Sequence, residues 1–190
     1  MPVDPSSLQV VHYPDPILRR KAATIVLTDE VRQVAHAMVR LMAEEEGIGL
    51  AAPQVGLAWR MFVASVPPGE GRKVSDDPMT CQPGPQVYIN PVLSKPEGPV
   101  EPYEEGCLSL PDIRGTVFRP PVITITALDL EGNTFTQRAG GLLARCWQHE
   151  MDHLDGVLII DKMPPAFRMR AKPILQDLEA EYQSRSRGLL

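Results

Sequence analysis

The sequence has few cysteines and no long apolar run, and each shortage excludes a class of protein. The three cysteines, Cys81, Cys107 and Cys146, are too few and too widely spaced for the disulfide framework of a small secreted domain. No stretch approaches the roughly 18 apolar residues of a membrane span, and residues 1–9 lack the basic start and apolar run of a secretory signal. We therefore expect a protein of a bacterial-type cytoplasm with no membrane partner.

Positive charge is also in short supply. The 19 lysines and arginines stand against 24 aspartates and glutamates, which gives a formal net charge of −5. Proteins that bind nucleic acid usually carry a basic excess, so we expect no direct nucleic-acid substrate. The 190 residues, 43% of them hydrophobic, are enough for one core, and we expect a single domain over residues 1–190.

The spacing of apolar residues predicts three helices. Over residues 29–46 apolar side chains recur every three or four positions, directly after Thr28, which suits an N-cap. Residues 141–153 contain no proline and are apolar on most of the circumference, as expected of a buried helix. A charged helix is expected over residues 166–186, interrupted near Pro173, within a C-terminal tail over residues 166–190.

Strands are expected around the second of these helices. Residues 60–65 and 86–92 are short runs rich in β-branched and aromatic side chains, and residues 121–130 and 134–138 predict a hairpin around a short Gly-containing turn. Residues 67–85, rich in Pro, Gly, Ser and Asp, predict an exposed and mobile insert. A helix buried among antiparallel strands, with one helix toward each end of the chain, is an α+β fold.

His149, Glu150 and His153 form the pattern His-Glu-x-x-His in the predicted central helix. At roughly 100° per residue the two histidines lie about 40° apart on one face and about 6 Å apart along the axis, so both can bind one metal ion. Glu150 borders that face and suits a general base and acid acting on an activated water. A buried helix must give these polar groups partners, which favours a metal site over a chance pattern.

A catalytic ion needs a third protein ligand, and the candidates separate the classes of enzyme. A metzincin would carry its third histidine at position 159, where this chain has Ile159. A thermolysin-like peptidase needs a downstream carboxylate, for which Glu179 in the charged tail helix is the remaining candidate. Cys146 lies about 10 Å along the helix axis from His153, which is beyond the reach of its side chain.

Cys107 is the other candidate for the third ligand. A lone cysteine is ordinarily a small buried apolar side chain. Here Gly106 allows a close approach of the backbone, and a thiolate at Cys107 would complete a Cys-His-His set with one coordination position left for water. Zn2+, Fe2+, Co2+ and Ni2+ all suit these ligands, and the ligand types alone do not choose among them.

Three segments resemble the signature motifs of the peptide deformylase family, in the family's order and at comparable separations. They are residues 47–54 (GIGLAAPQ), residues 105–109 (EGCLS) and residues 148–156 (QHEMDHLDG). Residues 13–18 (YPDPIL) are similar to the family as well, so the likeness covers most of the chain.

The resemblance implies an amidohydrolase that removes the formyl group from N-formylmethionine at the start of newly made proteins and releases formate. It implies an α+β fold with a central metal-binding helix among mostly antiparallel strands. Cys107, His149 and His153 would hold one divalent ion, Fe2+ in the native family, for which Zn2+, Ni2+ or Co2+ can substitute.

The resemblance also assigns roles around the ion. Glu150 would transfer protons, while the side chain of Gln54 and the backbone N–H of Leu108 would stabilise the tetrahedral oxyanion. Further residues would bind the substrate. They are Ile48, Leu142 and Cys146 around the methionine side chain, Gly49 and Gly106 beside the peptide backbone, and Glu105 and Arg114 near the mouth of the pocket.

Two other interpretations stay open. A silent relative would bind formylated or other N-termini without hydrolysis, and the presence of Glu150, Gln54 and Cys107 argues against it. An endopeptidase would need the missing downstream ligand. The tail from Ala166 is interpreted either as a contact with a partner such as the ribosome or as a solvated helix, and its charge favours the solvated helix.

Overall fold

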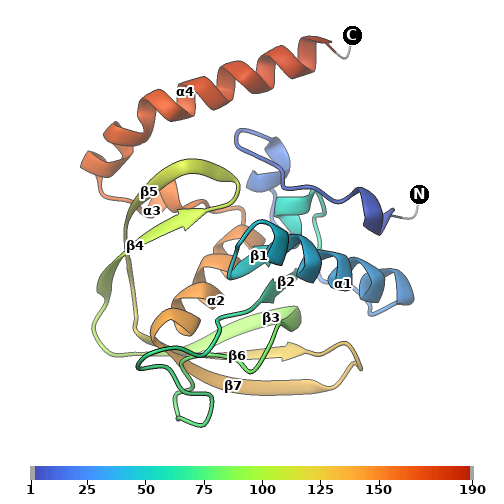
Figure 1. Ribbon diagram of the computed structural model, residues 1–190, viewed down its shortest axis with the longest axis vertical. Coiled ribbons are helices and arrows are strands. Elements are labelled where there is room, and N and C mark those ends of the chain that lie inside the picture. The colour runs from blue at the N-terminus through green and yellow to red at the C-terminus, as the bar shows by residue number, and fades with distance from the viewer. Residues whose placement is uncertain (1–2, 189–190) are drawn as a thin grey trace.

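The computed structural model describes residues 3–188, and side chains over residues 3–185. In this part of the chain a five-stranded sheet and a two-stranded sheet accompany four α-helices and three short 3-10 helices (Figure 1). The helices are α1 (Asp29–Glu44), α2 (Gly141–Leu154), α3 (Ile159–Lys162), α4 (Pro165–Gly188), η1 (Pro5–Ser7), η2 (Pro16–Arg19) and η3 (Ala52–Val55). The strands are β1 (Gly49–Ala51), β2 (Met61–Ala64), β3 (Gln86–Glu97), β4 (Glu101–Cys107), β5 (Leu110–Arg119), β6 (Val122–Leu128) and β7 (Thr134–Gly140).

The larger sheet has the order β1-β2-β3-β6-β7, and all of its neighbouring strands are antiparallel. Strand β2 is apolar at every position because both of its faces are covered. Met61 and Val63 belong to the hydrophobic cluster beneath α1, whereas Phe62 and Ala64 belong to the cluster beneath α2. The sheet therefore lies between α1 and α2.

Helix α2 is a core element, and ten of its fourteen residues are buried. Its sheet-facing side includes Trp147, whose indole N–H donates to the hydroxyl of Tyr88 at 3.0 Å. The Tyr88 ring in turn stacks on Phe62 with 4.6 Å between ring centroids. This aromatic contact holds one face of α2 against the sheet and leaves another face for chemistry.

The β4–β5 hairpin covers a different side of α2 (Figure 1). Its residues Ile113 and Val117 are packed in a third hydrophobic cluster with Ile159 of α3 and Ala171 of α4. The pairing of β4 with β5 shifts between Gly106 and Cys107, the residue at which β4 ends. The sequence patterns did not predict this hairpin, because four exposed residues at the start of β4 break the expected alternation.

The α+β prediction is confirmed, with mostly antiparallel strands around α2. The predicted interruption at Pro173 is wrong, since α4 continues through this residue. Proline removes the hydrogen bond to the carbonyl of Met169, a residue that is 76% exposed, so water can satisfy that carbonyl. No helix within residues 3–188 is long and apolar enough to cross a membrane.

The insert over residues 67–85 contains no helix or strand of the described fold, as expected. Its predicted exposure is wrong at its C-terminal end, where Cys81 and Gln82 are buried. The Gln82 amide donates to Tyr88 and accepts from the backbone N–H of Val66, which anchors this end in the core. The outer limits of the predicted domain, residues 1 and 190, lie outside the described residues.

Gly156, which follows α2, generates a prediction about stability. Its φ is +73°, and a Cβ here would lie 2.5 Å from the carbonyl oxygen of Arg19. Gly71 has nearly the same φ, +71°, but open space around it. Both alanine variants bear the cost of a left-handed residue, whereas Gly156→Ala should lose about 1–3 kcal/mol more of the free energy of unfolding because of the clash. Urea unfolding measures the free energy of unfolding of both variants. Equal losses of this free energy in Gly156→Ala and Gly71→Ala would contradict the prediction.

Candidate metal centre and active-site cleft

Helix α2 presents His149 and His153 on a face turned away from Trp147, and Glu150 borders that face. The two imidazole rings are 5.0 Å apart between centroids and meet edge to face. His153 is buried, and its Nε2 lies 3.3 Å from the Sγ of Cys107. The helical spacing of the motif therefore brings both histidines to one place, as the sequence analysis predicts.

Cys107 reaches this place from the end of β4. One potential ligand atom from each of Cys107, His149 and His153 lies within 4.8 Å of the other two, and no other group of this kind occurs among the described side chains. In a tetrahedral site with bonds of about 2.0–2.3 Å, ligand atoms are roughly 3.3–3.8 Å apart. The three side chains therefore fit a divalent ion.

The orientation of His149 is set by Glu105. The carboxylate contacts Nδ1 of His149 at 3.0 Å, which leaves Nε2 available for an ion. Glu105 in turn receives two hydrogen bonds from the guanidinium of Arg119, at 2.7 and 2.9 Å, and one from Arg145 at 2.9 Å. Glu105 is expected near the pocket mouth from the family resemblance, whereas its carboxylate is buried and directed at these three side chains.

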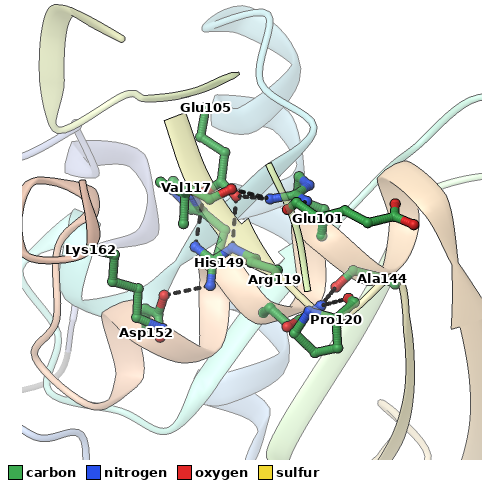
Figure 2. Close-up of polar contacts among 11 residues, drawn as sticks. Glu101, Glu105, Val117, Arg119, Pro120, Ala144, His149, Asp152 and Lys162 are labelled. Carbon is green, nitrogen blue, oxygen red and sulfur yellow. Dashed lines mark hydrogen bonds and ion pairs between the residues drawn. The ribbon is translucent and has the colours of Figure 1, made fainter. Parts of the chain in front are cut away.

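The guanidinium of Arg119 extends this network to Asp152, as Figure 2 shows. It donates to Asp152 at 2.7 Å, and the other oxygen of Asp152 accepts from Lys162 at 2.6 Å. Asp152 lies between the two histidines of the motif, so the same helix turn carries both candidate ligands and a carboxylate of their hydrogen-bond network. Sequence reasoning missed Arg119 because it lies 30 residues before His149 and matches no local pattern.

Electrostatics favours a positive charge between Cys107 and His149. Burial by itself would lower the pKa of His149, but hydrogen bonds to Cys107 and Glu105 outweigh it and raise the pKa to about 10. Burial likewise opposes ionisation of Glu105, yet Arg119 and His149 hold the pKa of this carboxyl well below its usual range. A fixed carboxylate behind one ligand and a sulfur beside it suit a divalent cation.

Glu150 is buried next to the two histidines. Burial raises the pKa of its carboxyl to about 7, and its Oε2 has no hydrogen-bond partner among the described residues. Gly49 of β1 makes room for this carboxylate, because a Cβ there would lie 2.3 Å from Oε1 of Glu150 and 2.9 Å from Sγ of Cys146. The sequence analysis assigned Gly49 to the substrate backbone, and the structure adds this packing requirement.

Gln54, in η3, is buried with its amide directed at the site. Its Oε1 accepts from the backbone N–H of Ala51 at 2.9 Å, which leaves the amide nitrogen facing inward. That nitrogen donates to Ser109 Oγ at 3.2 Å and to Cys107 Sγ at 3.6 Å. The amide nitrogen of Gln54 is therefore a hydrogen-bond donor beside the candidate metal site.

These residues surround a cavity of about 490 Å³. Every residue that the sequence analysis assigned to the site lines it, apart from the deeply buried His153. The lining also contains Tyr103 and Arg145, which were not predicted. Helical spacing is the signal that would have found Arg145, because it lies one turn before His149 on the same face.

The two alternative candidates for the third ligand, Glu179 and Cys146, have other partners. Glu179 accepts a hydrogen bond of 2.7 Å from the hydroxyl of Tyr13, on the side of α4 that faces the N-terminal segment. Cys146 lines the cavity, but its thiol donates to the carbonyl of Ile48 at 3.3 Å. Among the described residues, only the cysteine at the end of β4 joins the two histidines.

Comparisons with known proteins agree with this geometry. The family model for polypeptide deformylase matches residues 7–168. The chain belongs to the peptide deformylase family. It is 42% identical to the peptide deformylase of Acinetobacter baumannii (strain SDF) over 166 residues, which covers 87% of this chain and 88% of that protein. As a member of the family it is a metal-dependent hydrolase.

Relatives from eukaryotes are similar too. The chain is 38% identical to the chloroplastic/mitochondrial peptide deformylase 1B of Arabidopsis thaliana over 182 residues, which is 94% of this chain but 62% of that longer protein. A crystal structure of the Plasmodium falciparum peptide deformylase matches with a TM-score of 0.82 and 35% identity, over 93% of this chain and 98% of the other.

The ligand set generates a prediction about metal binding. Cys107→Ser should weaken the affinity for Zn2+ or Co2+ by at least about a hundredfold, because a serine hydroxyl does not ionise as a thiol does. Cys146→Ser is the matched control, since the new hydroxyl can still donate to Ile48 and lies outside the ligand group. Competition with a chromophoric chelator measures both affinities. Equal affinities in the two variants would show that Cys107 is not a ligand.

Proposed function

We propose that this chain hydrolyses the formyl amide of N-formylmethionyl peptides, releasing formate and the free α-amine of methionine. The observation that carries the proposal is the meeting of a β4 cysteine with the His-Glu-x-x-His helix in a chain of this family. The third ligand separates this hypothesis from the metzincin and thermolysin-like alternatives. The proposed place of action is a bacterial-type cytoplasm, on newly made proteins.

We propose that Cys107, His149 and His153 hold one divalent ion, Fe2+ in the native protein and replaceable by Zn2+, Ni2+ or Co2+. Two imidazoles and a thiolate suit all of these ions. A divalent ion held there supplies Lewis acidity to the substrate carbonyl and to an attacking water. Glu105 keeps the ring of His149 in the orientation that this requires.

Glu150 transfers the protons of the reaction. Its unpartnered oxygen accepts the proton that the attacking water loses, and the pKa of about 7 suits both gain and loss of a proton near neutral pH. The protonated carboxyl then gives this proton to the amine nitrogen as the C–N bond breaks. Water and the formyl amide thus give formate and the protonated amine, which takes up the proton that formic acid loses.

The amide of Gln54 and the backbone N–H of Leu108 stabilise the oxyanion that forms on the formyl carbon. The buried amide of Gln54 is held by Ala51, so little reorganisation is needed when negative charge develops. Leu108 lines the same cavity, directly after Cys107. Both donors are therefore close to the proposed ion.

The methionine side chain enters the cavity beside Ile48, Leu142 and Cys146. The peptide backbone runs past Gly49 and Gly106, where the absence of side chains allows close pairing. Arg114 is proposed near the mouth, together with Glu105, whose carboxylate is however engaged with His149. A contact of α4 with the ribosome stays a prediction.

Substrate selectivity tests the proposed function. After anaerobic loading with Fe2+, the protein should hydrolyse formyl-Met-Ala-Ser and leave both Met-Ala-Ser and an internal peptide intact. Formate release and peptide cleavage are measured in parallel. Absence of turnover would refute the proposed hydrolysis and favour a silent binding protein, whereas cleavage of the internal peptide would favour the endopeptidase.

A substitution tests the role of Glu150. Glu150→Gln should lower kcat by about 10²–10⁴, because the amide cannot accept the proton, while bound metal stays near the wild-type level. Glu179→Gln changes the same functional group outside the cavity, where it contacts Tyr13, and should keep the wild-type kcat. Steady-state kinetics and metal analysis measure both effects. A Glu150→Gln variant with wild-type kcat would contradict the assignment.

A further inference from the structure

One face of α2 presents five residues to the cavity, and one of them has no part in the proposed hydrolysis. Leu142, Arg145, Cys146, His149 and Glu150 follow the three- and four-residue spacing of a single helix face, and all five line the cavity. Arg145 stands between the residues proposed to hold the methionine side chain and the candidate ion ligand one turn further on. The helix residues proposed to hold the methionine side chain, Leu142 and Cys146, are apolar, and Arg145 is the cation beside them.

The guanidinium of Arg145 is held in one position. Its Nη1 donates to Glu105 at 2.9 Å and to the carbonyl of Val117 at 3.1 Å, and its Nη2 donates to the carbonyl of Glu101 at 2.9 Å. The ring of Tyr103 covers the planar group, with 5.1 Å from Cζ to the ring centroid. The side chain is 11% exposed, so it is ordered before any ligand arrives.

This arrangement leaves hydrogen-bond donors unused. A guanidinium carries five N–H bonds, of which the three contacts of Arg145 use three. Within residues 3–185 no acceptor is recorded for the Nε–H or for the second N–H of Nη2. These bonds lie in the plane of the group, so the Tyr103 ring over its face does not block them. Arg145, which lines the same cavity as Leu142 and Cys146, therefore keeps two N–H groups with no recorded partner.

The positive charge of Arg145 is only partly neutralised, because it shares its carboxylate partner with other groups. Its one carboxylate partner is Glu105, which also carries the ion pair with Arg119 and the contact with His149. One carboxylate therefore faces two guanidinium groups, although Arg119 has Asp152 as a second partner. The cavity wall at Arg145 favours a ligand that ends in an electron-rich acceptor.

We propose that Arg145 determines the side-chain specificity of the cavity and extends it from methionine to methionine sulfoxide. This inference rests on the proposed function and specifies its substrate class. A sulfoxide oxygen is polar and sits near the end of an unbranched side chain of methionine's length, so an all-apolar pocket would exclude it. The N–H groups of Arg145 give this oxygen a charge-assisted hydrogen bond. The reaction is the same hydrolysis, and the sulfur keeps its oxidation state.

Three formyl tripeptides of equal length test the proposal, with methionine, methionine sulfoxide or norleucine ahead of Ala-Ser. The ratio of kcat/KM for the sulfoxide to kcat/KM for norleucine reports the polar contact, because the two side chains have similar lengths. In the wild-type protein the two values should agree within about tenfold. In Arg145→Met the ratio should fall by roughly 10- to 100-fold, the contribution of one hydrogen bond to a charged group.

Arg119→Met is the matched control for Arg145→Met. It removes another arginine from Glu105, but Arg119 is absent from the cavity lining. This variant should slow all three peptides alike and keep the wild-type ratio. Arg145→Lys retains the charge without the planar fork, so its ratio should lie between those of the wild type and Arg145→Met.

Several results would overturn the proposal. An equal loss on all three peptides in Arg145→Met would mean that Arg145 only positions Glu105. The proposal would also be refuted if kcat/KM of the wild-type protein for the sulfoxide peptide were more than a hundredfold below its kcat/KM for the norleucine peptide. This result does not depend on whether the variants fold. If the wild-type protein turned over none of the formyl peptides, the proposed function itself would fail, and this inference with it. Turnover of formyl-methionine with a ratio insensitive to Arg145 would overturn this inference alone.

Discussion

The buried carboxylate of Glu105 joins the β4–β5 hairpin to α2, and the geometry of the site depends on this contact. It accepts hydrogen bonds from Arg119 and Arg145 and contacts Nδ1 of His149. Cys107 follows two residues later on the same strand, so one short segment carries a candidate ligand and the orienting partner of another. Removing one member would leave uncompensated charge in a buried place, which is far more costly than losing an exposed ion pair.

Burial disfavours the charged form of both carboxyl groups of this site, and the partners of each group decide the direction of its pKa shift. Burial raises the pKa of the Glu150 carboxyl to about 7, because the charges of His149 and Arg119 lower this pKa by less than burial raises it. Glu105 experiences the same desolvation, but Arg119 keeps it ionised. Two carboxyl groups in one cleft thus differ in charge: Glu105 is an anion behind His149, and Glu150 is the proposed proton carrier.

Local patterns predicted the elements whose stabilising contacts are local. Thr28 caps α1 by accepting from the backbone N–H of Val31, and the spacing over α2 placed His149 and His153 on one face. The β4 strand was missed because its charged and exposed residues hide the alternation, and it is defined by pairing with β5. The break expected at Pro173 did not occur, since an exposed turn of helix can leave a carbonyl to water.

The sequence by itself determined which side chains are available for chemistry: the two histidines and the glutamate on one helix face, and a cysteine in a family motif. Only the tertiary structure decided how they meet, since Cys107 lies more than 40 residues before His149 and its distance depends on the packing of the hairpin against α2. The place of Arg145 was decided in the same way. Helical periodicity is a property of neighbouring residues, whereas a contact between strand and helix is set by the whole core.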